Sequence, residues 1–310
     1  MRFLPLSLGN WKQGENVKLS LSTCATERRI IPGGFEFAPI EGLQQCKDAG
    51  FQYVDFNFAN AASDGRPMSC DDWENWIETV CEAKDTLGLT VEQTHGHWFH
   101  LNQLASDEEL AWHDEMVRRS LVCSSKLGEK PWVVMHPRSI FGTEGYDAKK
   151  SDSYNYEKFM ELGELAAKLG IRIAVENLFA NSCIGACCNA EALVSFVESL
   201  RSDVFGICWD FGHANRAGLN HLESLDIVAP YLRVTHCHDN KGRSDDHFIP
   251  RFGNVPWNEI MPKLKQIGYT GNLNMEVHVF YNTFPQSLRM DGLRFMRSVG
   301  EELVSRFDKA

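Results

Sequence analysis

The sequence predicts an α/β protein, a single (β/α)8 TIM-barrel domain over residues 1–310. Eight short apolar runs alternate with helix-patterned stretches along the chain. Each strand-helix unit takes about 30 to 40 residues, and a chain of 310 residues commonly forms one such barrel. The glycine-rich turns GxGxxG and GxxxxGKS/T, typical of open nucleotide-binding sheets, do not occur. A closed barrel is therefore favoured over an open doubly wound sheet.

The strand-like runs are short and rich in β-branched or aromatic residues. They lie near residues 17–23, 52–57, 89–95, 131–136, 171–176, 205–210, 231–237 and 272–278. Helical periodicity covers residues 71–87, 106–126, 154–169, 189–200, 256–266 and 285–305. Gly50, Gly88, Gly170 and Gly268 close helices before the next strand, where a left-handed C-cap is favourable. The strands should therefore run parallel, with their carboxyl ends at one end of the barrel.

Four successive strands in the second half end at a metal-capable side chain. They are IRIAVE at Glu176, VFGICWD at Asp210, YLRVTH at His236 and GNLNME at Glu276. Any one of these carboxylates could instead cap a helix or pair with an arginine, but four in succession favour a shared metal site. Three carboxylates and one imidazole suit a divalent ion such as Mn²⁺, Mg²⁺ or Co²⁺, and Zn²⁺ is also compatible.

The charge of the chain argues against nucleic acid as a partner. The net charge is −11 with a pI near 5.5, and lysines and arginines are scattered rather than clustered. The longest apolar runs are too short to cross a bilayer, and the first residues do not resemble a secretory signal. We therefore expect no membrane association and a cytoplasmic location. Aromatic residues in the barrel loops are compatible with a homo-oligomer.

Further histidines follow strand ends or lie in neighbouring loops. They are His95 and His97 in VEQTHGH, His136 in VVMHP, His213 in WDFGHAN and His247 in DDHFIPRFGNVPW. Imidazoles at such positions hydrogen-bond substrate hydroxyls or bind additional metal, although a lone histidine is more often a satisfied structural group. We predict substrate contacts for His97, His136, His213 and His247. Arg251 is a further candidate for substrate recognition, through a phosphate, but it belongs to no defined anion cradle.

Taken in order, these motifs resemble the xylose isomerase-like TIM-barrel superfamily, in its sugar phosphate isomerase/epimerase branch. The resemblance covers most of the chain and rests on VEN at Glu176, WDFGH at 209–213, HxxD at 236–239, HxxP with GxVPW at 247–257, and MEV at Glu276. It implies that Glu176, Asp210, His236 and Glu276 hold the metal. It also implies that the two glutamates form the acid/base pair and that His213 assists at a substrate oxygen. One departure is Arg251, where the family pattern has glycine.

These features predict a metal-dependent sugar or sugar phosphate isomerase or epimerase that moves a proton next to a carbonyl. Its partner would be a small-molecule carbohydrate. A lyase or dehydratase on a polyol or keto sugar needs the same proton abstraction and stays open. A second alternative is a phosphodiesterase like the apurinic endonucleases, in which His97, His136, Asp245 and His247 would supply additional metal positions. A third is a sugar-binding barrel without turnover.

Overall fold

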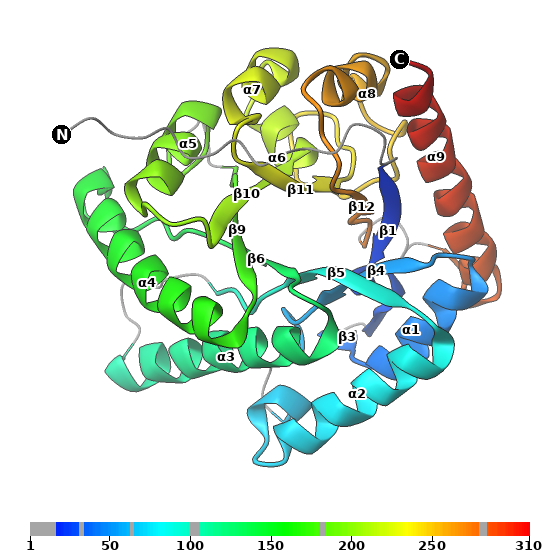
Figure 1. Cartoon of the computed structure of the whole chain (residues 1–310), viewed down its shortest axis with the longest axis horizontal. Coiled ribbons are helices and arrows are strands. Elements are labelled where there is room, and N and C mark those ends of the chain that lie inside the picture. Colours follow the sequence, from blue (N-terminus) through cyan, green and yellow to red (C-terminus); the bar gives the residue numbers. More distant parts are fainter. Residues whose placement is uncertain (1–16, 31–33, 63–64, 100–105, 180–183, 279–283) are drawn as a thin grey trace.

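The computed structural model describes residues 17–30, 34–62, 65–99, 106–179, 184–278 and 284–310. Its centre is one closed barrel of parallel strands, ringed by helices (Figure 1). The barrel strands are β1 (Lys18–Ser22), β4 (Tyr53–Asn57), β5 (Thr90–His95), β6 (Trp132–Met135), β9 (Arg172–Glu176), β10 (Phe205–Asp210), β11 (Leu232–Cys237) and β12 (Asn272–Met275). They follow one another around the ring in chain order, and β12 pairs with β1 to close it. The predicted (β/α)8 fold is confirmed.

The helices lie outside the barrel; α1 to α8 lie in the connections between successive barrel strands, and α9 follows the last strand (Figure 1). They are α1 (Pro39–Asp48), α2 (Trp73–Leu87), α3 (Asp107–Leu127), α4 (Ala148–Leu169), α5 (Ala190–Ser199), α6 (Phe211–Arg216), α7 (His221–Val228), α8 (Trp257–Gln266) and α9 (Arg289–Lys309). Two short antiparallel pairs decorate the loops: β2 (Arg28–Ile30) with β3 (Gly34–Glu36), and β7 (Phe141–Gly142) with β8 (Gly145–Tyr146). In the described part of the chain, no helix is long and apolar enough to cross a bilayer.

Local capping explains where several elements begin and end. The glycines predicted to close helices all have positive φ, for example Gly88 after α2 at 63° and Gly170 after α4 at 71°. Helix α4 begins earlier than the periodicity indicates because the Asp147 side chain accepts a hydrogen bond from the Lys150 backbone. Helices α6 and α7 both lie in the connection between β10 and β11, where helical periodicity did not indicate them.

The barrel has an apolar outer layer and a partly polar interior. Large apolar side chains, such as Trp209, Phe211 and Trp257, are buried in the continuous core. In contrast, Ser20, Asp55, Gln93 and Asn274 from four neighbouring strands hydrogen-bond to one another and are fully buried. Because these four contact each other across the strands of a closed ring, they share the face that points into the barrel. Asp55 of this polar group lies 3.5 Å from His236, one of the four strand-end side chains predicted to bind a metal.

Candidate metal centre and active site

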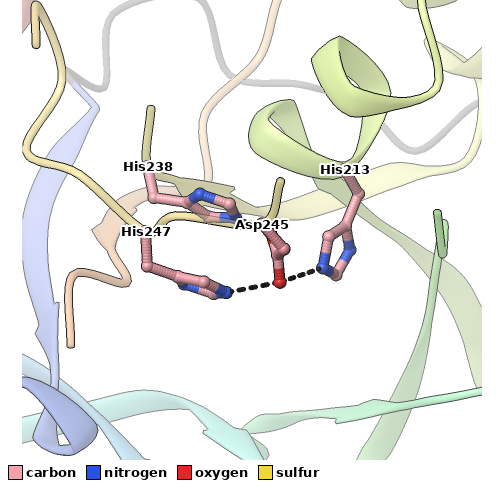
Figure 2. A group of neighbouring side chains, drawn as sticks. All are labelled: His213, His238, Asp245 and His247. Atoms are coloured by element: carbon pink, nitrogen blue, oxygen red, sulfur yellow. Dashed lines mark hydrogen bonds and ion pairs between the residues drawn. The ribbon is translucent and has the colours of Figure 1, made fainter. Parts of the chain in front are cut away.

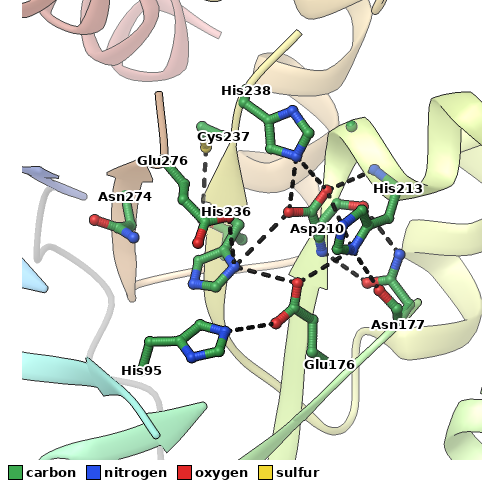
Figure 3. A network of polar contacts seen from close by, with 12 residues as sticks. His95, Glu176, Asn177, Asp210, His213, His236, Cys237, His238, Asn274 and Glu276 are labelled. Atoms are coloured by element: carbon green, nitrogen blue, oxygen red, sulfur yellow. Dashed lines mark hydrogen bonds and ion pairs between the residues drawn. The ribbon is translucent and has the colours of Figure 1, made fainter. Parts of the chain in front are cut away.

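The four strand-end side chains predicted as metal ligands lie together at the carboxyl end of the barrel (Figure 3). Glu176, Asp210, His236 and Glu276, called here the central group, each offer a ligand atom, and these atoms all lie within 4.8 Å of one another. His236 Nδ1 is 3.3 Å from Glu176 Oε1, 3.3 Å from Glu276 Oε2 and 3.7 Å from Asp210 Oδ2. All four residues are buried.

The strands themselves bring these side chains together. Glu176 is the last residue of β9, where it lies opposite Cys208 of β10. Asp210 ends β10 two residues further on and lies opposite His236 of β11. Asp210 also caps α6, where its Oδ1 accepts a hydrogen bond of 2.6 Å from the His213 backbone. Glu276 follows the last residue of β12, and its backbone N–H donates to the Cys237 carbonyl of β11 at 3.2 Å.

The buried carboxylates and histidines in and beside the central group shift one another's pKa values. Burial by itself would raise the pKa of Glu176, but His236 and His136 beside it hold that pKa well below the ordinary value. Burial likewise opposes protonation of His213, yet Asp210 and Asp245 raise its pKa well above the ordinary value. Glu176 is therefore held as a carboxylate, the form that can bind a cation or accept a proton.

A second metal-capable group shares Glu176 with the central group. It consists of His95, His136 and Glu176. His136 Nε2 is 2.9 Å from Glu176 Oε2 and 3.1 Å from His95 Nε2. The other oxygen of the same carboxylate, Oε1, faces His236 and also His213 at 3.2 Å. Glu176 thus lies between two ligand sets, with one oxygen toward each.

A third group contacts Asp210 through His213 and His238, and Figure 2 shows its four side chains. It contains His213, His238, Asp245 and His247. Asp245 Oδ2 lies between His247 Nε2 at 2.9 Å and His213 Nε2 at 3.6 Å. Asp245 raises the pKa of His247 to about 9 against the opposing effect of burial. His238 stacks on His247, with ring centroids 3.8 Å apart, and its Nε2 is 3.1 Å from Asp210.

Two residues predicted to contact substrate lie apart from these three groups. His97 Nε2 is 3.0 Å from His113 Nδ1 on α3, and burial together with His113 lowers the pKa of His97 to about 3. Arg251 donates to Asn258 on α8 and forms a 2.8 Å ion pair with Glu302 on α9. Their substrate contacts stay predictions. In contrast, His136, His213 and His247 belong to the metal-capable groups.

Two buried residues of the site escaped the sequence-based prediction. Asn177 exchanges two hydrogen bonds with the backbone of Asp210, which joins the ends of β9 and β10. Asp55 on β4 lies within 3.5 Å of His236. The asparagine in VEN carries no local pattern that would indicate its partner. A carboxylate in the middle of the buried strand Tyr53–Asn57 is the signal that could have found Asp55.

The chemistry of the donor set fits a divalent cation. Three carboxylates buried within a few ångströms repel one another unless a cation or protons compensate them. Oxygen-rich ligands with one imidazole suit Mn²⁺, Mg²⁺ or Co²⁺ in the central group. The third group, with three imidazoles and one carboxylate, has the ligand types that Zn²⁺ prefers.

The protein is thus a closed parallel barrel, and side chains that could hold a metal ion lie together at the carboxyl ends of its strands. The chain belongs to the xylose isomerase-like TIM-barrel family, whose model matches residues 43–299. The predicted family membership is thereby confirmed.

Relatives and solved structures agree with this placement. The chain is 33% identical over 204 residues to the uncharacterized protein MJ1311 of Methanocaldococcus jannaschii, covering 64% of this chain and 68% of that protein. It is 26% identical over 149 residues to fructoselysine 3-epimerase of Escherichia coli O157:H7, covering 46% and 52%. Among solved structures, a D-tagatose 3-epimerase-like protein superposes with a TM-score of 0.73 at 20% identity, covering 94% of this chain and 99% of that one. At this identity the superposition shows the fold.

Proposed function

We propose that this protein is a divalent-metal-dependent isomerase or epimerase of a sugar or sugar phosphate. The observation that carries the proposal is the placement of Glu176 and Glu276. Each has a carboxylate oxygen 3.3 Å from the same nitrogen, His236 Nδ1, so the two carboxylates face a common volume from the ends of β9 and β12. The fructoselysine 3-epimerase relative and the D-tagatose 3-epimerase-like structure support this choice of reaction.

Two carboxylates around one volume suit the exchange of a proton at a carbon acid. Glu176, held ionised by its histidines, accepts the proton from the carbon next to the substrate carbonyl. Glu276 supplies a proton to the other face of that carbon, or to the former carbonyl carbon while the neighbouring hydroxyl proton passes to the carbonyl oxygen. The first outcome inverts the stereocentre and the second moves the carbonyl. A divalent ion bound by the central group would polarise the carbonyl and lower the cost of the developing negative charge.

Histidines around the pair would then hold the sugar. His136 is one-fifth exposed beside Glu176, whereas His213, which also contacts Glu176, and His247 are nearly buried. Their ring nitrogens are suited to hydrogen bonds with substrate hydroxyls. The acidic surface, with a net charge of −11, favours a small molecule over a polyanion as the partner.

The test is solvent-deuterium exchange into a panel of ketoses and polyols, with Mn²⁺ or Co²⁺. The Glu276→Gln variant should lose at least about a hundredfold in exchange, the usual contribution of a general acid or base. The exposed glutamate Glu259 on α8 provides a matched control, and Glu259→Gln should exchange at the wild-type rate. Wild-type exchange with every sugar at the background rate would refute the proposal.

One observation favours a second candidate, a metal-dependent phosphodiesterase. Several metal-capable groups lie side by side among the described residues. Glu176 belongs to the central group, to the group with His95 and His136, and to one with Cys208 and His236, while Asp210 contacts His238 of the third group. Several metal ions in a row suit phosphodiester cleavage, where they stabilise the attacking and leaving oxygens. Metal analysis of the purified protein and an assay with an abasic duplex test this candidate. Cleavage by wild type, together with more than one metal per chain, would place it ahead of the sugar reaction.

A further inference from the structure

Asp55 is a carboxylate buried in the barrel interior, beside the central group. It lies in the middle of β4, and its relative exposure is 0%. No lysine or arginine forms an ion pair with it among the described residues, and its ion-pair partner there is His236. Burying an unpaired carboxylate costs desolvation free energy, so a carboxylate at this position needs a compensating partner.

His236 presents its two ring nitrogens to different surroundings. Nδ1 faces the carboxylates of the central group, at 3.3 Å from both Glu176 and Glu276. Nε2 points the other way, is buried without a hydrogen bond of standard geometry, and lies 3.5 Å from Asp55 Oδ2. An imidazole can donate a hydrogen bond from the N–H of one nitrogen while its other nitrogen binds a metal. Nδ1 is therefore oriented toward the metal position, and Nε2–H toward Asp55.

Asp55 is itself held in position by amide donors. Asn274 Nδ2 donates to Asp55 Oδ2 at 2.8 Å, and Gln93 Nε2 donates to the same oxygen at 3.3 Å. Asn274 is oriented in turn, because its Oδ1 accepts a 2.9 Å hydrogen bond from Ser20. The chain of contacts runs from β1 through β12 and β4 to the ring of His236 on β11. It fixes the direction of the acceptor that the imidazole meets.

We propose that Asp55 is the positioning residue of the metal centre, which completes a carboxylate–histidine–metal triad through His236. The carboxylate selects the Nε2–H tautomer and leaves the Nδ1 lone pair free for the cation. It also makes the imidazole a stronger ligand. The inference rests on the metal centre of the proposed function and not on the sugar reaction. A wild-type protein that binds metal but exchanges no sugar would refute the reaction and leave this inference intact.

The first test is calorimetric titration of metal-free protein with Mn²⁺. Asp55→Asn keeps the shape and removes the charge, and should weaken binding by about 10- to 100-fold, the usual effect of losing such a partner. The control is Thr94→Val on β5, which removes a buried hydroxyl bonded to Ser124 away from the centre. It should bind Mn²⁺ within twofold of wild type. Metal affinity is the deciding readout, because a merely structural role of Asp55 would change the melting temperature and leave the affinity for Mn²⁺ unchanged.

Binding by Asp55→Asn within twofold of wild type, with a lower melting temperature of the metal-free protein, would overturn the proposal and show a purely structural role. A measurement on wild type covers the case in which the variant does not fold. Histidine-selective ¹⁵N NMR, with His236 assigned from a His236→Gln sample, should show the Nε2–H tautomer in metal-free protein and a Zn²⁺-induced shift at Nδ1. An Nδ1–H tautomer, or metal at Nε2, would overturn it.

Discussion

Glu27 offers a quantitative test of how burial governs charge in this barrel. It lies in the loop after β1, with a relative exposure of 7%, and accepts a hydrogen bond from the Asn60 side chain. Burial raises its pKa from 4.5 to about 7, although Asn60 and the nearby Arg66 act in the opposite direction. The difference corresponds to about 3 kcal/mol in the free energy of unfolding. We therefore choose Glu27→Gln, which keeps the hydrogen-bond acceptor and cannot ionise.

The direction in which stability changes with pH depends on how many protons the native and the unfolded states bind. Between pH 4.5 and 7 the unfolded chain releases the Glu27 proton while the native protein keeps it, so native stability falls as pH rises. Below pH 4.5 both states hold the proton and the penalty disappears. The Gln variant has no such penalty at any pH. Its stability relative to wild type should thus increase by about 3 kcal/mol from below pH 4.5 to above pH 7.

Urea unfolding of both proteins at several pH values between 4.5 and 8 measures this difference. The other carboxylates titrate in both proteins, so their effects cancel when the two free energies are subtracted. Glu259→Gln, at an exposed position, controls for the loss of a surface charge. A difference between Glu27→Gln and wild type that does not change with pH would refute the reasoning.

Three further predictions concern strain, packing and metal. Arg251 has a φ of 88°, a backbone conformation that glycine adopts more easily than alanine. In urea titrations the free energy of unfolding of Arg251→Gly should be about 1 kcal/mol higher than that of Arg251→Ala, since both variants lose the Glu302 ion pair and only alanine keeps the strain. Equal stabilities would contradict this. Gly212→Ala would place a Cβ 1.9 Å from the His238 ring, and should cost about 1–3 kcal/mol in urea unfolding; a cost below about 0.5 kcal/mol would argue against this packing. A chelator should lower the melting temperature of metal-loaded protein, because metal at a thousandfold over its Kd stabilises by about 4 kcal/mol. An unchanged melting temperature would contradict a metal bound to the native state.

The fold could be predicted almost entirely from local patterns. Short β-branched runs and helical periodicity depend on neighbours within one element, and the glycines at 88 and 170 mark helix ends through backbone sterics alone. Strand ends in a closed parallel barrel necessarily meet at one end. For this reason the strand pattern was sufficient to predict that Glu176, Asp210, His236 and Glu276 lie together.

Other features of the site depend on side-chain direction and could not be inferred in this way. His95 is the last residue of β5 and still obeys the strand alternation, whereas His97 lies two residues beyond it, where alternation no longer applies, and turns to His113 on α3. Arg251 reaches Glu302 on α9 because its backbone adopts a left-handed conformation. The local sequence pattern does not indicate the direction of either side chain.

Local sequence patterns therefore suffice for the barrel and for the four metal-capable strand ends, because both follow from the periodicity of single elements. Long-range packing is needed to divide the two oxygens of Glu176 between two ligand sets, and to bring Asp55 against the far nitrogen of His236. Those contacts join residues of different strands, and their geometry is fixed by the register and closure of the whole ring.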